Sequence, residues 1–168
     1  PVVLHEINTP VICALNGGAA GYGMDLAMGC DIRIASDKSK LAPAFTRRGV
    51  VPESGGTWLL PRMIGWAKAA EIFYTGKTLS AEKCLELGLV NKVVPADSLM
   101  DEAMAMANEI ASSAPLAVQA TKRMMRAAMS EQFPDHVHHV FLQILPLFQT
   151  EDFKEGMMAF LEKREPEF

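Results

Sequence analysis

The chain has 168 residues, of which 49% are hydrophobic and 21% charged, a composition ordinary for a globular domain. Its formal net charge of -4 gives no general electrostatic reason to bind nucleic acid or an anionic membrane. No stretch approaches the roughly 18 uninterrupted apolar residues of a membrane-spanning helix. The cysteines (Cys13, Cys30 and Cys84) show neither metal-ligand spacing nor the density of a disulfide framework. We therefore expect buried free thiols and a cytoplasmic protein. A targeting segment upstream of Pro1 would not be visible in these 168 residues.

Residues 10–56 are predicted to alternate between strand, helix and loop. The apolar run "PVICALNG" (10–17) ends in Asn-Gly and predicts a buried strand followed by a turn. A helix is expected from about residue 23 to 30, and "DIRIAS" (31–36) alternates apolar and polar residues as a strand does. Prolines and glycines then predict a loop over 40–56 with at most one short helix.

Helical spacing dominates after residue 56, with predicted breaks at Pro61 and Gly65. In "TLSAEKCLELGLV", Ser80 stands at an N-cap position and Gly88 at a C-cap position, and the following "NKVVP" predicts a short strand. The rest of the chain predicts helices alone, over 98–112, 115–130, 133–149 and 151–164. This order indicates an α/β core followed by a helical extension.

The stretch "NGGAAGYGMDLAMGCD" (16–31) concentrates glycines and alanines between a strand and a helix. Such a turn leaves backbone N–H groups unpaired at a helix start and lets another molecule approach closely. A dinucleotide-binding turn would need a third glycine where Leu26 stands, and a nucleoside triphosphate loop would need a following Gly-Lys-Ser/Thr. Two interpretations remain: tight packing of helix against strand, or an oxyanion hole for a carbonyl oxygen that becomes negatively charged.

Two acidic residues lie in apolar surroundings near this turn. Asp25 belongs to the predicted helix, where an acid is costly unless it is paired or used, and Glu53 stands between a proline and two glycines. Two acids near an oxyanion hole suit proton transfer next to a thioester carbonyl. Alternatively, Asp25 caps a helix or pairs with an arginine (Arg33, Arg47 or Arg48). The alternative for Glu53 is stabilisation at a helix N-terminus.

The chain resembles the crotonase (enoyl-CoA hydratase/isomerase) superfamily in motifs that span essentially its whole length: "PVICALNGGAAGYGMDLAMGCDIRIAS", "RRGVVPESGGTWLLPRMIG", "AAEIFYTGKTLSAEKCLELGLVNKVVP" and "TEDFKEGMMAFLEKREPEF". The resemblance implies a spiral core of ββα turns over residues 1–112, truncated at its N-terminus, and a helical trimerisation region over 113–168. It also implies an enzyme of fatty acid metabolism that acts on acyl-CoA thioesters as a homotrimer or a dimer of trimers. No cofactor is expected, because coenzyme A is part of the substrate.

In this family two backbone N–H groups polarise the thioester carbonyl. By motif, the resemblance assigns one of them to Tyr22, between Gly21 and Gly23. It assigns the other to a segment upstream of this sequence, so that the chain by itself would hold half of the oxyanion hole. It further implies that Phe160 and Lys163 face the coenzyme A end of a site in the same or a neighbouring subunit. Surface salt bridges are the alternative for that last region.

The acids depart from the pattern of the family's hydratases. By resemblance, those hydratases carry one glutamate at the position of Asp25 and a second at about Phe45, which is not an acid here. Glu53 instead matches the acid of the family's enoyl-CoA and dienoyl-CoA isomerases. We therefore predict that double-bond isomerisation is favoured, with Glu53 as the proton-transfer residue and Asp25 as second acid or orienter. A 2-enoyl-CoA hydratase of the β-oxidation type and a non-catalytic acyl-CoA-binding trimer stay open as alternatives.

Two further runs of residues, one rich in histidine and one basic, could indicate a metal site or a nucleic-acid site. The run "HVHH" (136–139) offers several imidazoles, but on a helix they do not converge with an acidic ligand. We expect a polar helix surface and no metal site there. The run "TKRMMRAAM" (121–129) is basic on one face, yet it lacks a wider patch or interleaved aromatic residues. We expect a solvated face or a subunit contact, and no nucleic-acid partner.

Overall fold

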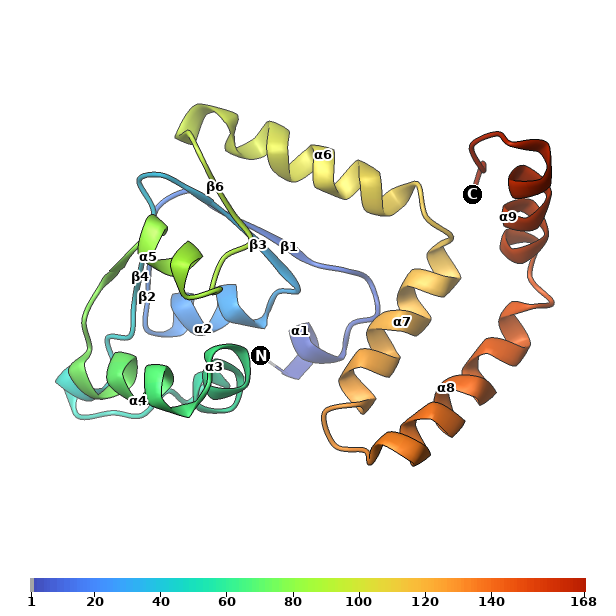
Figure 1. Ribbon diagram of the computed structural model, residues 1–168. Coiled ribbons are helices and arrows are strands. Elements are labelled where there is room, and N and C mark those ends of the chain that lie inside the picture. Colours follow the sequence, from blue (N-terminus) through green and yellow to red (C-terminus); the bar gives the residue numbers. More distant parts are fainter. Residues whose placement is uncertain (1) are drawn as a thin grey trace. The chain divides into compact units, whose positions relative to one another are not determined.

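The computed structural model describes residues 2–168, which divide into two compact units (Figure 1). The first unit comprises residues 2–7 and 11–105, and the second comprises residues 8–10 and 106–168. The division falls inside helix α6 (Leu99–Ala111), ahead of the boundary after residue 112 that the sequence predicts. No helix within residues 2–168 is both long enough and apolar enough to cross a membrane.

Two small sheets form the frame of the first unit. One has the order β1-β3-β6 and is parallel throughout, and the other has the order β2-β4-β5 with β5 antiparallel to β4. The chain passes from a strand of one sheet to a strand of the other and then into a helix, first as β1-β2-α2 and again as β3-β4-α3. This confirms the predicted spiral of ββα turns. The strands are β1 (Ile12–Leu15), β2 (Gly18–Ala20), β3 (Ile32–Ser36), β4 (Lys40–Ala42), β5 (Leu79–Ser80) and β6 (Lys92–Val94).

The helices that the sequence predicts in the first unit are present, with one correction, and the structure adds α1 and η2, which were not predicted. The expected break at Pro61 is wrong: α3 continues through the proline, which removes only one N–H from the helix ladder. The helix stops at Gly65, whose φ of 81° an L-residue rarely adopts. Besides α6, the helices are α1 (Val2–Glu6), α2 (Tyr22–Gly29), η1 (Thr46–Arg48), α3 (Gly56–Ile64), α4 (Trp66–Thr75), α5 (Ala81–Glu86) and η2 (Ala96–Ser98).

Helix α5 begins at the predicted N-cap. The Ser80 hydroxyl accepts a hydrogen bond from the Lys83 amide at 3.3 Å, which confirms this prediction.

The cysteines test a second local prediction. The prediction of buried thiols holds only for Cys84, because Cys13 and Cys30 are partly exposed. Burial raises the pKa of the Cys84 thiol to about 11 and so favours its protonated form.

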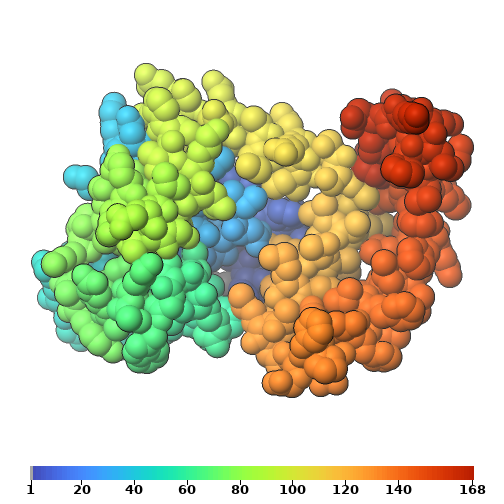
Figure 2. All heavy atoms as spheres, viewed as in Figure 1, coloured from blue at the N-terminus to red at the C-terminus, as the bar shows by residue number. Residues whose placement is uncertain are grey.

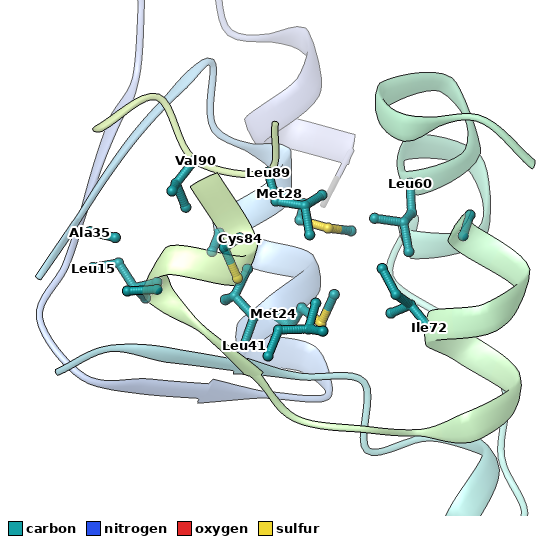
Figure 3. Packing of buried hydrophobic residues seen from close by; sticks show 14 of the residues in the cluster. Leu15, Met24, Met28, Ala35, Leu41, Leu60, Ile72, Cys84, Leu89 and Val90 are labelled. Carbon is teal, nitrogen blue, oxygen red and sulfur yellow. The ribbon is translucent and has the colours of Figure 1, made fainter. Parts of the chain in front are cut away.

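The core of the first unit lies between the sheets and helices α2, α3 and α4. Met24 and Met28 of α2 are 0% and 2% exposed, and they point toward Leu60 of α3 and Ile72 of α4 (Figure 3). On the other side α2 faces the strands that carry Leu41 and other buried side chains. Because methionine is long and unbranched, it fills the irregular space between these elements. The inner side of α2 is therefore fixed by packing.

The second unit contains helices α7 (Pro115–Ala127), α8 (Phe133–Leu147) and α9 (Glu151–Glu162). The basic face of α7 is partly used within this unit. Lys122 Nζ donates to the Thr9 carbonyl at 2.9 Å, and Arg126 Nη2 donates to Asn8 Oδ1 at 2.8 Å. These contacts tie the segment 8–10 to α7, which gives two of its cations a structural role.

Helix α8 presents its apolar side chains to the surface. None of its residues is buried, and its orange atoms are visible on the face drawn in Figure 2. Large apolar side chains are rarely left exposed together on one element of a monomeric protein. The exposed set comprises Phe133, Val137, Val140, Phe141, Leu142, Ile144 and Leu145.

Candidate active site

The glycine-rich turn ends in a sharp bend that starts helix α2. Gly21 has a φ of 54°, a conformation that favours glycine, and its amide donates to the Ala42 carbonyl at 2.9 Å. Its own carbonyl accepts from the Asp25 amide at 3.1 Å and so closes the first turn of the helix. The Tyr22 amide, at the first helical position, donates to no acceptor within residues 2–168. Helix starts with open amides of this kind attract negative charge.

The opposite end of α2 is held by a buried arginine. Arg33 is 6% exposed, and its Nη1 donates to the carbonyls of Ala27, Met28 and Cys30 at 3.3, 3.3 and 2.6 Å. Its Nε donates to the Leu89 carbonyl at 2.7 Å. A cation at a helix C-terminus is favoured by the helix dipole, although burial lowers the pKa of Arg33. The alternative that Arg33 pairs with Asp25 is wrong, because the guanidinium serves these carbonyls.

Asp25 lies within α2 and is only 1% exposed. Its Oδ2 accepts a hydrogen bond from the Gly56 amide at 3.1 Å, whereas its buried Oδ1 has no partner in the described part of the chain. Burial raises the pKa of the Asp25 carboxyl, and the nearby charge of Glu53 adds to that effect. The backbone amides of Gly56 and Ser54 act in the opposite direction, because they stabilise the charged form.

Glu53 is exposed, in the turn that leads into α3. The Ser54 hydroxyl approaches its Oε1 at 3.5 Å. Neither nearby arginine binds it: Arg47 Nε donates to the Thr75 carbonyl and Arg48 Nη1 to the Ala44 carbonyl, both at 2.9 Å. The carboxylate is therefore accessible to a ligand.

Asp25 and Glu53 line one cavity of about 340 Å³ in the first unit. Its polar lining includes these acids and Ser54, and its apolar lining includes Leu26 and Trp58. Tyr22 is not among the lining residues. It lies one helical turn before Asp25 and Leu26, on the same face of α2. The structure thus brings the two acids to one cavity, and the open amide lies at the start of the helix that carries Asp25.

The aromatic part of this cavity was not foreseen from the sequence. The rings of His5 and Trp58 meet edge to face with centroids 5.4 Å apart, and both line the cavity. The Arg62 guanidinium lies 4.1 Å from the centroid of the Trp58 ring. Trp58 follows the acid and the two glycines in "PESGGTW", and this proximity is the only sequence signal that could have marked it.

The position that family resemblance aligns with a second hydratase glutamate is apolar and buried. Phe45 is 4% exposed and belongs to the hydrophobic core. A side chain built at Gly21 would meet its ring at 3.9 Å, so Phe45 lies beneath the glycine turn. This position therefore provides no group that could activate water.

The remaining predicted residues lie in the second unit. Phe160 is 76% exposed on α9, and Lys163 follows this helix as an exposed C-cap. Their role in binding coenzyme A stays a prediction. Around "HVHH", the Nδ1 atoms of His136 and His139 contact the two carboxylate oxygens of Glu131 at 2.7 and 2.8 Å. Within residues 2–168, no three His, Cys, Asp or Glu side chains come together in a way that could hold a metal ion.

Comparison with known proteins identifies the family. The sequence profile of the enoyl-CoA hydratase/isomerase family matches residues 2–168. A probable enoyl-CoA hydratase of Mycobacterium bovis is 42% identical, over 98% of this chain and 64% of its own length. A carnitinyl-CoA dehydratase of Proteus mirabilis is 39% identical, over 98% of this chain and 65% of its own. A crystal structure of an enoyl-CoA hydratase from Bacillus anthracis matches with a TM-score of 0.96 at 36% identity, over 99% of this chain and 65% of that one.

The chain belongs to the enoyl-CoA hydratase/isomerase family, and the resemblance read from its motifs is confirmed. The high TM-score also confirms the crotonase-like fold of the chain. This chain spans 64% and 65% of the length of the two relatives named above.

Proposed function

We propose that the protein processes acyl-CoA thioesters by stabilising a thioester enolate and moving a proton with a carboxylate. The observation that carries this proposal is the open Tyr22 amide at the start of α2, one helical turn before Asp25, which lines a cavity together with Glu53. An amide aimed at a developing oxyanion stabilises it without reorganisation. Family membership supports the same class of substrate, because the relatives named above are a hydratase and a dehydratase of CoA esters.

Double-bond isomerisation is the reaction that fits these residues best. Glu53 would take a proton from C2 of a 3-enoyl-CoA, the Tyr22 amide would bind the dienolate oxygen, and Glu53 would return the proton at C4 to give the 2-enoyl-CoA. One accessible carboxylate suffices for this shuttle. Glu53 is exposed and unpaired with the neighbouring arginines, whereas Phe45 supplies no second acid for water activation.

Hydration of a 2-enoyl-CoA is the second candidate. It is favoured by the names of the relatives, which describe addition or removal of water, and by the presence of two carboxylates on one cavity. In that case Asp25 and Glu53 together would hold the water molecule. A protein that binds acyl-CoA without turnover is the remaining candidate and would show tight binding of CoA esters with no product.

A pair of substrates and one isosteric variant separate these reactions. The full-length gene product is incubated with a 3-enoyl-CoA and with crotonyl-CoA in D₂O, and products are followed by mass spectrometry. We expect the 3-enoyl-CoA to shift its double bond, and Glu53→Gln to lower kcat by about 10²–10⁴-fold. The exposed Glu86→Gln on α5 serves as a matched control. Hydration that dominates and survives Glu53→Gln would contradict the isomerase assignment.

We also propose that α8 packs against other copies of the chain, in a trimer or a dimer of trimers. The support is that α8 carries several large exposed apolar side chains and buries none of its residues within the described chain. Phe141→Asp should dissociate the assembly, because it places a charge on the exposed apolar set. Light scattering after gel filtration measures this, with the exposed Asn108→Asp on α6 as control. A wild-type monomer at all concentrations would refute the proposal.

A cytoplasmic location and a reaction without cofactor stay predictions. The first is supported by three cysteines that form no disulfide with one another. The second rests on the substrate class, since coenzyme A enters and leaves with the acyl group.

A further inference from the structure

Helix α3 starts without a capping side chain of its own. Its N-cap is Gly55, which has no side chain, and Gly56 is the first helical residue. The amides at a helix start need acceptors from elsewhere, normally from a serine, threonine, asparagine or aspartate at the N-cap. Here Asp25 Oδ2, which lies 31 residues earlier and on a different helix, accepts from the Gly56 amide at 3.1 Å.

The carboxylate and Gly56 fit together so tightly that position 56 has no room for a side chain. A Cβ at Gly56 would lie 2.3 Å from Asp25 Oδ1 and 2.9 Å from both Cγ and Oδ2. Gly56 does not have the positive φ that requires glycine at Gly55, where φ is 105°. Asp25 Oδ1 thus occupies the space of the missing side chain.

The same contact determines where the turn before α3 lies. Glu53 is three residues before Gly56, and the residues between them are Ser54 and Gly55. The Ser54 amide also stabilises the charged Asp25 carboxyl. Of the two acids, Glu53 is exposed and lines the cavity, whereas Asp25 is buried with its Oδ2 bound to the start of α3 and its Oδ1 without a hydrogen-bond partner in the described part of the chain.

We propose that Asp25 is a positioning residue, which holds the start of α3 and thereby places the Glu53 carboxylate toward the substrate. This inference rests on the proposed function, in which Glu53 moves the proton. Asp25 then contributes through a hydrogen-bond acceptor at the Gly56 amide and through the volume of its carboxyl group. It does not itself exchange a proton with the acyl chain.

Two substitutions at one position distinguish positioning from proton transfer. Asp25→Asn keeps the shape and an acceptor for the Gly56 amide but cannot ionise, whereas Asp25→Ala removes both. For the full-length gene product we expect Asn to retain kcat within about fivefold and to leave the pH profile unchanged, since Glu53 remains the residue that moves the proton. We expect Ala to lower kcat by about 10²-fold with a smaller effect on KM, because the base is misplaced.

The kcat and pH profile of the Asp25 variants are compared with those of Glu53→Gln. If Asp25→Asn loses as much activity as Glu53→Gln, or shifts the pH profile, Asp25 transfers a proton and the positioning role is wrong. If Glu53→Gln is fully active, the proposed function fails instead. In that case Asp25 has no positioning role in catalysis. The double-mutant cycle described next still decides whether Asp25 of α2 stabilises the start of α3.

A double-mutant cycle tests the contact without any activity. Gly56→Ala alone should lower Tm by roughly 5–10 °C, because its Cβ overlaps the Asp25 carboxyl group. In the Asp25→Ala background the same change should cost less than about 2 °C, since the overlapping atoms are gone. Gly17→Ala is the control, because a Cβ there meets no atom within 4 Å. Additive effects of the two substitutions would overturn the proposal.

Discussion

Helices α2 and α8 are both rich in apolar residues, but only α2 has side chains that are fully buried within the described chain. Four of its eight residues are buried, and Arg33 binds the carbonyls at its C-terminal end. Helix α8 has 15 residues, and none of them is buried. Its Phe141 is 60% exposed, whereas Met24 on α2 is 0% exposed.

The difference shows that an apolar helix sequence does not reveal what covers the helix. Full burial of an apolar side chain contributes roughly 1.5–3 kcal/mol, and a helix with no fully buried side chain in its own chain is suited to association with another. Helix α2 therefore presents its open N-terminal amide from a fixed position, which a binding site requires. Helix α8 presents a surface suited to assembly.

The largest effect on the free energy of unfolding is expected from replacing Arg33, which binds the carbonyls at the C-terminal end of α2. Arg33→Met should lower the free energy of unfolding by about 3–5 kcal/mol, because it removes the donors to several buried carbonyls. Urea denaturation measures the change. Arg48→Met is the control, since Arg48 is exposed and gives one hydrogen bond to Ala44, and it should cost less than about 1 kcal/mol. Equal effects of the two substitutions would mean that α2 is not held in this way.

A truncation in each helix sharpens the comparison. Met24→Ala should lower the free energy of unfolding by about 2–5 kcal/mol, because it leaves a cavity in the core. Phe141→Ala should change it by about 0.5 kcal/mol or less in dilute protein. If α8 packs against other copies, the Phe141 effect should grow with protein concentration. A large effect of Phe141→Ala that does not depend on concentration would show that the chain itself covers α8.

The smallest effect concerns pH and an ion pair at the end of α9. Arg164 donates to both Glu155 oxygens at 2.6 and 2.9 Å, and these bonds lower the Glu155 pKa to about 2. Since the unfolded pKa of glutamate is about 4.3, the folded state gains stability above that pH and loses it as pH falls toward 2. Glu155→Gln should flatten this part of the Tm–pH curve. An unchanged curve would show that the pair contributes nothing measurable, as for many surface pairs.

The order of strands and helices followed from the sequence, but some short elements did not. Strand β2 (Gly18–Ala20) lies within the glycine turn, where the absence of β-branched residues hides it. Strand β5 (Leu79–Ser80) has only two residues, which is too short for the alternation of apolar and polar residues that marks a strand. The break expected at Pro61 was wrong because one missing N–H is tolerated when the rest of α3 is packed.

The candidate site was only partly predictable for a similar reason. The glycine turn, Asp25 and Glu53 stand out because acids and small residues are unusual in apolar surroundings. His5 and Trp58 carry no such signal, since a histidine and a tryptophan have many roles, and only the fold brings their rings together beside the two acids.

The sequence by itself determined much of the local structure: most of the longer helices and strands, the Ser80 cap, and the bend at Gly21. These features depend on backbone sterics and on neighbours a few residues away. Only the tertiary structure decided that Asp25 binds the Gly56 amide and that Arg33 serves carbonyls instead of a carboxylate. Asp25 and Gly56 are far apart in the chain, as are Arg33 and Leu89, so the folded geometry alone selects these partners among the many acceptors and donors that the sequence offers.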